Sequence, residues 1–203
     1  MSNRQILLSG LFLWLFAVAG TTFVAVTENL AREPIVENER RVLLRNLHAL
    51  LPAHELDNDI VTDTLRIPAS ELLGTDEPSL VYRARYQSVP VAAIFNSIAP
   101  NGYSGKIHLL VGVYFDGSIA GVRVLKHSET PGLGDAIEIM KSDWILDFDG
   151  KSLGNPLRGL WLVKHDKGVY DQFTGATITP RAVVEAVKNT LLYYEQNAGE
   201  IFQ

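Results

Sequence analysis

The feature that most constrains this chain is an uncharged apolar stretch near its N-terminus. From Ile6 to Val26 there are 21 residues without a charged side chain, and a helix of roughly 20 apolar residues crosses the hydrocarbon core of a bilayer, about 30 Å thick. The stretch predicts a single membrane-spanning helix. Arg4 precedes it and Glu28 follows it, which favours a cytoplasmic N-terminus and export of the remaining chain.

A cleaved signal peptide is the alternative to a retained anchor. Ala17-Val18-Ala19 is a small-x-small site that follows a hydrophobic region of suitable length. Apolar residues continue past this site to Val26, which is longer than secretion requires and favours the anchor. Both alternatives place the rest of the chain outside the cytoplasm.

The composition excludes several classes of function. The formal net charge is −5 and no run of Lys or Arg occurs, so nucleic acid is not expected as a partner. The absence of cysteine excludes iron–sulfur clusters, thiolate nucleophiles and disulfides. The five histidines show no metal-ligand spacing, and there is no nucleophile elbow, P-loop or dinucleotide fingerprint. We therefore expect no metal site and no independent hydrolase, NTPase or NAD-binding activity.

Three parts are expected along the chain: a membrane anchor at residues 1–30, a membrane-proximal helix at 31–52, and one exported domain at 53–203. Apolar residues recur at near-helical spacing in the second part, which ends at Pro52. The third part has the length of a single domain.

The exported part carries strand signals before helical ones. Leu80–Tyr86 and Val91–Ile98 are rich in Val, Ile, Tyr and Phe and predict a strand pair. Lys106–Lys126 predicts a hairpin with a two-residue type I′ turn at Asp116-Gly117. A further short strand is expected at Leu160–Val163.

The hairpin turn predicts which side chains lie opposite each other. One face becomes almost wholly apolar and is expected in the core, since the turn pairs Phe115 with Ser118, Val113 with Ala120, Val111 with Val122, and Leu109 with Val124. On the other face Gly112 lies opposite Gly121. These missing side chains predict close packing of another element, with a flat ligand as the less favoured alternative.

Helical patterns follow the hairpin. A short helix is expected at Asp135–Lys141, and a final helix at Pro180–Glu195 with Thr179 as its N-cap. The predicted fold class is α+β: an N-terminal transmembrane helix followed by one exported domain with a mainly antiparallel sheet flanked by helices.

The segment Asp171-Gln172-Phe173-Thr174-Gly175-Ala176-Thr177 precedes this last helix. Free N–H groups and a partial positive charge at a helix N-terminus would favour a phosphate on the Thr177 hydroxyl. The same residue types serve more often in capping and turns, and local physics alone favours that structural interpretation.

This segment resembles the flavinylation motif of the FMN-binding domain family, Asp-x-x-Ser/Thr-Gly-Ala-Thr/Ser, and every defining position matches. Two further blocks of that family occur in the same order, Gly-Tyr-Ser-Gly at 102–105 and Glu-Thr-Pro-Gly-Leu-Gly at 129–134. Within the family, nearly the whole chain is similar to the G subunits of Rnf-type ion-translocating electron-transport complexes. The related C subunits of the sodium-pumping NADH:quinone reductase are longer. Residues 53–78 match least.

The resemblance implies a cofactor and a cellular setting. FMN would be joined to Thr177 by a phosphoester, transferred from FAD by a Mg²⁺-dependent flavin transferase. The chain would be an electron-transfer subunit without turnover of its own. It would be anchored once in the bacterial inner membrane, with its main domain in the periplasm, and assembled with the other membrane and redox subunits of an Rnf-type complex.

The resemblance also implies a set of residues around the flavin. Asp171 and Thr174 would position the phosphate or the transferase substrate, although Asp171 suits a simple turn equally well. The 129–134 loop would contact the isoalloxazine or ribityl chain, unless it is purely structural. Trp144, Tyr103 and Trp161 are aromatic candidates, but buried aromatic residues more often belong to the core. The residues expected to bind the cofactor are Thr177, Thr174, Gly175, Ala176, Asp171, Glu129, Thr130, Gly132, Leu133, Gly134 and Trp144.

A second class of function competes with the flavoprotein. The chain could instead be a flavin-free exported binding or scaffold module of a membrane complex, in which Thr177 only begins a helix.

Overall fold

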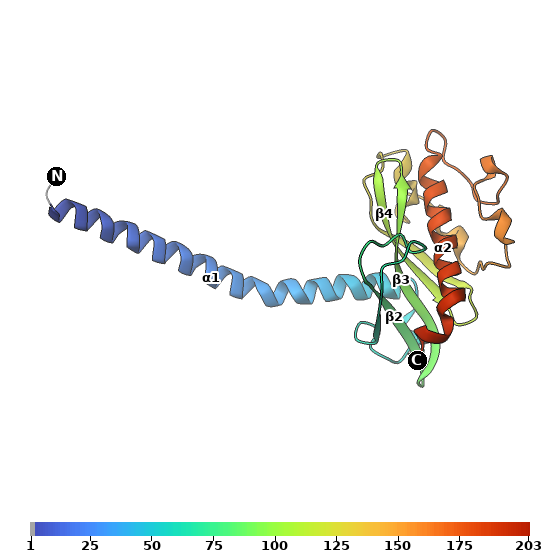
Figure 1. Cartoon of the computed structure of the whole chain (residues 1–203), viewed down its shortest axis with the longest axis horizontal. Helices are drawn as coiled ribbons and strands as arrows, with labels where there is room; N and C mark the ends of the chain where they lie inside the picture. Colours follow the sequence, from blue (N-terminus) through green and yellow to red (C-terminus); the bar gives the residue numbers. More distant parts are fainter. Residues whose placement is uncertain (1–2) are drawn as a thin grey trace. The chain divides into compact units, whose positions relative to one another are not determined.

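The computed structural model describes residues 3–203, which form two compact units, one up to Leu43 and one from Leu44 to Gln203. The first two residues of the expected anchor lie outside the described residues. Helix α1, Asn3–His48, is continuous (Figure 1) and contains Pro34. The anchor and the membrane-proximal helix, expected as separate elements, are therefore one helix, and it ends before Pro52.

The N-terminal part of α1 has the properties of a membrane span. Its Gly10–His48 portion contains an 18-residue window with a mean hydropathy of 1.9, and no residue in that window is buried. Phe12, Phe16 and Phe23 are all exposed. A helix that is apolar on every side suits hydrocarbon rather than the surface of a water-soluble domain.

The second unit contains a five-stranded antiparallel sheet in which each strand neighbours the next along the chain. The α+β class, the strand pair and the hairpin predicted from the sequence are confirmed. The strands are β1 Thr64–Ile67, β2 Ser79–Tyr86, β3 Val89–Gly102, β4 Gly105–Tyr114 and β5 Ile119–Lys126.

The type I′ turn lies in the other hairpin. Between β2 and β3, Gln87 and Ser88 have φ values of 50° and 64°, the two positive angles that a type I′ turn requires. In the β4–β5 hairpin only Gly117 has a positive φ, 86°. The Tyr114 N–H donates to the Ser118 carbonyl at 2.7 Å, which closes a three-residue loop. The two-residue turn predicted at Asp116-Gly117 is therefore wrong.

The longer loop changes the hairpin register near its tip. The Asp116 carboxylate accepts a hydrogen bond from the Ser118 N–H at 2.9 Å, which stabilises the longer loop. A register shift after Gly112 then restores the predicted alignment. The pairs Val111–Val122 and Leu109–Val124 are confirmed, whereas Val113 pairs with Ile119 rather than Ala120, and Phe115 does not pair with Ser118.

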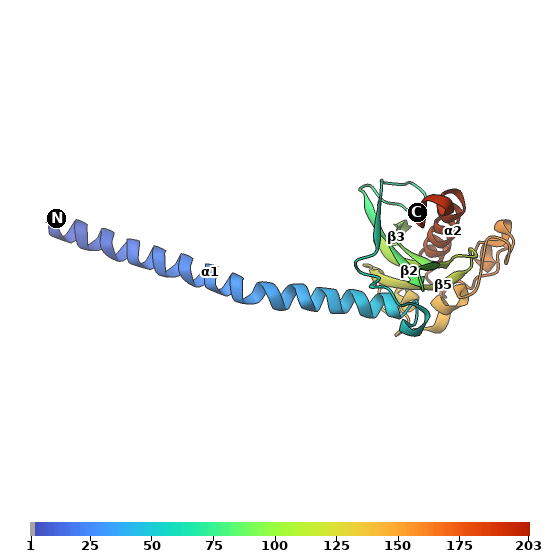
Figure 2. The ribbon, with the colours of Figure 1, turned by 90° about the horizontal axis from the view of Figure 1, so that it is seen from below.

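Different elements cover the two faces of the sheet. Helix α2, Ile178–Ile201, packs against β3 and β4 on one face (Figures 1 and 2). On the other face Gly112 pairs with Gly121, and a Cβ on Gly121 would lie 3.0 Å from the Leu50 side chain. The two glycines therefore admit a packed element, as predicted, and not a flat ligand.

The helical segments of the C-terminal half also differ from expectation. Helix α2 begins at Ile178 and ends at Ile201, beyond both predicted ends. The predicted strand at Leu160–Val163 is wrong, because Val163 makes only a single bridge, to Tyr170. The predicted helix at 135–141 shortens to one 3₁₀ turn. The 3₁₀ helices are η1 Ala53–Glu55, η2 Gly134–Ile137, η3 Asp143–Phe148, η4 Arg158–Leu160 and η5 Lys164–Asp166.

The loss of the strand at 160–163 has a packing cause. Trp161 is buried against Phe148 and Tyr170, with ring centroids 6.2 and 5.3 Å away. Its indole N–H donates to the Pro156 carbonyl at 3.1 Å. An aromatic cluster, rather than a neighbouring strand, therefore buries Trp161, and a short apolar run such as Leu160–Val163 does not by itself distinguish the two.

Candidate functional site

A cavity of about 310 Å³ lies beside the N-terminus of α2, a volume within the range of small-molecule sites. Three segments far apart in the sequence form it: the β3–β4 turn, the loop that follows β5, and the residues that lead into α2. Its lining is Tyr103, Glu129, Thr130, Leu133, Gly134, Gly175, Ala176, Thr177, Ile178 and Thr179.

A tight turn leads into this helix. The Ala176 N–H donates to the Phe173 carbonyl at 3.1 Å, and Gly175, the third residue of the turn, has a φ of 81°. This is the pattern of a type II turn, which favours glycine at that position because a Cβ would be strained there. The glycine of the motif therefore has a backbone role.

Thr177 occupies the N-cap position of α2, where Thr179 was predicted. Its side chain makes no capping hydrogen bond, although an N-cap hydroxyl ordinarily accepts one from the first turn. The first N–H groups of a helix have no partner within it. A half-buried, uncommitted hydroxyl thus lines a cavity at the positive end of a helix dipole.

Glu129 supplies a buried carboxylate to the cavity wall and is only 4% exposed. One carboxylate oxygen accepts the main-chain N–H of Ser104 at 2.9 Å, and the other accepts the hydroxyl of Thr179. Thr179 is fully buried. Its hydroxyl therefore donates to Glu129 instead of capping the helix, which explains why the predicted cap is wrong.

The loop from Glu129 to Asp135 is held by hydrogen bonds within the loop, one to a main-chain carbonyl and one to a side chain. The Gly134 N–H donates to the Thr130 carbonyl at 3.0 Å, and the Gly132 N–H donates to the Asp135 carboxylate at 2.8 Å. Gly132 has a φ of 76°. Thr130, Leu133 and Gly134 line the cavity, whereas Gly132 does not.

Trp144 lies behind the motif and not in the cavity lining. It is 6% exposed, and its indole N–H donates to the Asp171 carbonyl at 2.8 Å. Its ring meets Phe173 edge-on, with centroids 5.1 Å apart. The Asp171 carboxylate instead pairs with Lys164 at 2.6 Å, on the surface. Asp171, Thr174 and Trp144 therefore lie next to the cavity without lining it.

Seven of the eleven expected binding residues line one cavity: Glu129, Thr130, Leu133, Gly134, Gly175, Ala176 and Thr177. Ile178 and Thr179 line it as well but were not expected there, because the motif that supplied the expected residues ends at Thr177. Tyr103, an aromatic candidate from the Gly-Tyr-Ser-Gly block that was left out of the expected set, also lines the cavity, whereas Trp144 does not. Among residues 3–203 no cluster of three or more potential metal ligands occurs.

Comparisons with known proteins match two parts of the chain. Residues 1–50 match the RnfG N-terminal region, and residues 102–192 match the FMN-binding domain. Among solved structures, the crystal structure of Shewanella oneidensis NqrC aligns with a TM-score of 0.49 and 22% sequence identity. The alignment covers 73% of this chain and 74% of that chain.

Curated relatives extend the similarity over nearly the full length. The chain is 46% identical over 194 residues to the G subunit of the ion-translocating oxidoreductase complex of Pseudoalteromonas atlantica, covering 96% of this chain and 90% of that protein. The corresponding protein of Pseudomonas aeruginosa is 46% identical, with coverages of 97% and 92%. For that of Shewanella oneidensis the identity is 43%, with coverages of 98% and 94%. The chain belongs to the RnfG family, the G subunits of ion-translocating oxidoreductase complexes, and contains the FMN-binding domain of that family.

Proposed function

We propose that Thr177 carries FMN through a phosphoester and that the chain relays electrons through this flavin as a subunit of an Rnf-type membrane complex. The observation that carries the proposal is the position of the Thr177 hydroxyl. It lines the cavity, lacks a capping partner and adjoins the N-terminus of α2. The motif match from Asp171 to Thr177 adds the family evidence.

The cavity suits a flavin that is tethered covalently. Leu133, Ile178 and Tyr103 provide apolar and aromatic surface for a ring system. In the part of the chain that the structure describes, no lysine or arginine lines the cavity. Main-chain N–H groups and the helix dipole would therefore stabilise the charge of the phosphate. A covalent bond would supply the retention that a cationic side chain provides in sites for free nucleotides.

The attachment reaction would be catalysed by a separate flavin transferase. The Thr177 oxygen would attack the FMN phosphorus of FAD, forming the oxygen–phosphorus bond and breaking the pyrophosphate bond. AMP would leave, and the hydroxyl proton would pass to the transferase or to solvent. Bound flavin would then supply one-electron and two-electron redox chemistry. The chain itself would orient the ring and limit its contact with water.

Helix α1 supports the proposed cellular arrangement. The apolar part of the helix would cross the inner membrane once, with Arg4 on the cytoplasmic side. The domain from Leu44 onward would then lie in the periplasm, next to the other membrane and redox subunits of the complex.

The direct test is flavin fluorescence in a denaturing gel, because only a covalent flavin remains with the band. The full-length protein, co-expressed with the transferase, should give a fluorescent band, and the peptide containing Thr177 should carry the mass of one FMN. Thr177→Ala should abolish the signal, whereas Thr177→Ser keeps a hydroxyl and should retain it.

Each contrary result has a defined meaning. A dark band from the wild-type protein would eliminate the flavoprotein proposal and leave the flavin-free binding module. A fluorescent band from Thr177→Ala would move the attachment point to another residue.

A further inference from the structure

Within residues 3–203, no main-chain hydrogen bond joins the three segments that the cavity brings together. Tyr103 comes from the β3–β4 turn, Leu133 from the loop after β5, and Ile178 from the start of α2. A ring held among these three residues would be only as immobile as the segments that carry them. A side chain that ties the segments together is therefore a determinant of the site.

Glu129 makes such a connection from the loop to both other segments. Its carboxylate accepts the Ser104 N–H, one residue after Tyr103, at 2.9 Å. It also accepts the hydroxyl of Thr179, one residue after Ile178. A buried carboxylate is costly unless it is hydrogen-bonded, and hydrogen bonds to charged groups are stronger than neutral ones. Both contacts therefore constrain the positions of the segments they join.

Two glycines leave space for this carboxylate. A Cβ on Gly102 would lie 2.9 Å from a Glu129 carboxylate oxygen. A Cβ on Gly134 would lie 2.9 Å from the Thr179 hydroxyl and 3.1 Å from the other carboxylate oxygen. A Cβ on Gly102 would also lie 2.3 Å from the Gly105 carbonyl oxygen, so this glycine serves the turn as well as the carboxylate. At both positions the missing side chain leaves room for Glu129.

The Glu129 backbone is also fixed from outside the cavity. Its N–H donates to Nδ1 of His127 at 3.0 Å, so Nδ1 acts as an acceptor and the opposite ring nitrogen, Nε2, is left to donate. That nitrogen lies 2.7 Å from the Glu138 carboxylate. Main chain and side chain of Glu129 are thus both held before any ligand enters.

We propose that Glu129 is a positioning residue that keeps the three walls of the cavity at a fixed separation and thereby immobilises the flavin ring. The inference rests on the proposed attachment of FMN to Thr177 and adds the residue that restrains the ring. Glu129 acts through Ser104 and Thr179. One carboxylate oxygen accepts a hydrogen bond from the Ser104 N–H, and the other accepts one from the Thr179 hydroxyl. Among the described residues, the hydrogen bonds of the Glu129 carboxylate go to Ser104 and Thr179 and not to the turn at Gly175 or to Thr177, so we expect the attachment reaction not to require it.

The two ends of one hydrogen bond can be altered separately. Glu129→Gln keeps the size of the side chain but leaves one acceptor oxygen for two donors. Thr179→Val removes the hydroxyl donor while keeping a β-branched side chain, and Thr179→Ser restores a donor. Glu55→Gln is the matched control, because Glu55 also accepts a hydroxyl, that of Tyr114 at 3.1 Å, and does not line the cavity.

The experiment uses the full-length protein in detergent, after co-expression with the transferase. Flavin content is measured in a denaturing gel, and ring mobility is measured by fluorescence anisotropy and iodide quenching of the native protein. Glu129→Gln and Thr179→Val should keep the wild-type flavin content, lose most of the anisotropy and show severalfold stronger quenching. Thr179→Ser and Glu55→Gln should resemble the wild type.

Hydrogen exchange provides a readout that needs no flavin. In a Thr177→Ala background, Glu129→Gln should speed exchange of the Ser104 amide, whereas Glu55→Gln should not. Local opening of a single contact accelerates exchange at that contact without unfolding the domain.

Several results would overturn the proposal. Wild-type anisotropy and quenching in a folded Glu129→Gln or Thr179→Val protein would show that the connection does not restrain the ring. Loss of flavin attachment in a folded Glu129→Gln protein would place Glu129 in the attachment reaction instead. If Glu129→Gln fails to fold, Thr179→Val tests the same hydrogen bond from its donor side. Failure of FMN attachment itself would appear separately, as a wild-type protein without flavin.

Discussion

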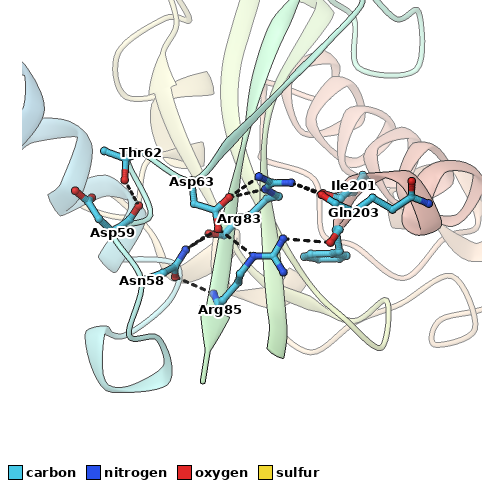
Figure 3. Close-up of polar contacts among 9 residues, drawn as sticks. Asn58, Asp59, Thr62, Asp63, Arg83, Arg85, Ile201 and Gln203 are labelled. Atoms are coloured by element: carbon cyan, nitrogen blue, oxygen red, sulfur yellow. Dashed lines mark hydrogen bonds and ion pairs between the residues drawn. The ribbon is translucent and has the colours of Figure 1, made fainter. Parts of the chain in front are cut away.

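Asp63 is the residue through which three parts of the domain meet. Its carboxylate accepts hydrogen bonds from Nε of Arg83 at 2.7 Å and from Nε of Arg85 at 3.0 Å. The two arginines also donate to main-chain carbonyls just after the end of α2 (Figure 3). Arg83 donates to Gln203 at 3.0 Å, and Arg85 donates to Phe202 at 3.1 Å. The group fastens the loop before β1 to β2 and to the end of α2.

Replacing Asp63 should destabilise the domain although it lies outside the cavity. Asp63→Asn leaves two largely buried arginines without their shared anion and should lower the free energy of unfolding by about 1–3 kcal/mol. Asp76→Asn is the control, because the Asp76–Lys106 pair is exposed and should contribute little. Urea unfolding of both variants tests this, and equal effects would contradict it.

Asp166 gives the first turn of α2 an acid-dependent contact. Hydrogen bonds from Arg181 and then from His165 lower the pKa of Asp166 to about 2 from the usual 3.8. A lowered folded-state pKa stabilises the fold above the unfolded value, and that stabilisation is lost as pH falls through about 2. The difference in Tm between wild type and Asp166→Asn should therefore be constant near neutral pH and close between about pH 4 and pH 2. A difference that persists at pH 2 would argue against the assignment.

At the scale of elements, the two hairpin turns carry different amounts of strain. Ser88 holds a φ of 64° without being glycine, a left-handed conformation that costs an ordinary residue roughly 1–2 kcal/mol. Ser88→Gly should therefore stabilise the domain by about 1 kcal/mol. Gly117→Ala, at a φ of 86°, should destabilise it by a similar amount. Thermal unfolding compares the two, and a stabilising Gly117→Ala would contradict the turn assignment.

The elements that sequence predicts well are those whose residues carry the information locally. The turn signal at Asp116-Gly117 predicted the Val111–Val122 pairing, which holds because the register shift after Gly112 offsets the extra loop residue. The Gly112–Gly121 gap predicted a packed element. The type I′ turn at Gln87 was missed because its composition is atypical, and because its N–H bonds to the side chain of Asp57 at 2.8 Å, 30 residues earlier.

In the site, too, local sequence predicted the segments but not the contact between distant positions. Motif resemblance identified the loop after β5 and the turn at Gly175, since each block is continuous in sequence. It could not place Thr179 against Glu129, because that hydrogen bond joins positions 50 residues apart. Thr and Pro are favoured at helix starts, so the N-cap was predicted at Thr179. In the structure the Thr179 hydroxyl donates to the buried Glu129 carboxylate instead, and Thr177 is the N-cap.

At the scale of the whole molecule, the second unit includes residues that the sequence assigned to the membrane-proximal helix. Leu47, Leu50 and Leu51 are 0%, 3% and 0% exposed, and Leu50 contacts the sheet at Gly112 and Gly121. Burying one leucine contributes about 1.5–3 kcal/mol, and a domain is stable by only about 5–15 kcal/mol in total. A stable fragment of the domain should therefore include these three side chains.

Two fragments separate the alternatives for the domain boundary. Residues 44–203 keep the three leucines and should unfold cooperatively as a soluble monomer. Residues 53–203 lack them, expose an apolar sheet face, and should lose several kcal/mol and bind a hydrophobic dye. In the 44–203 fragment, Leu50→Ala should cost about 2–5 kcal/mol, whereas Leu157→Ala, at a side chain 67% exposed, should cost little. Equal denaturant midpoints for the two fragments would return the boundary to Pro52, because the leucines would then contribute nothing to the sheet they cover.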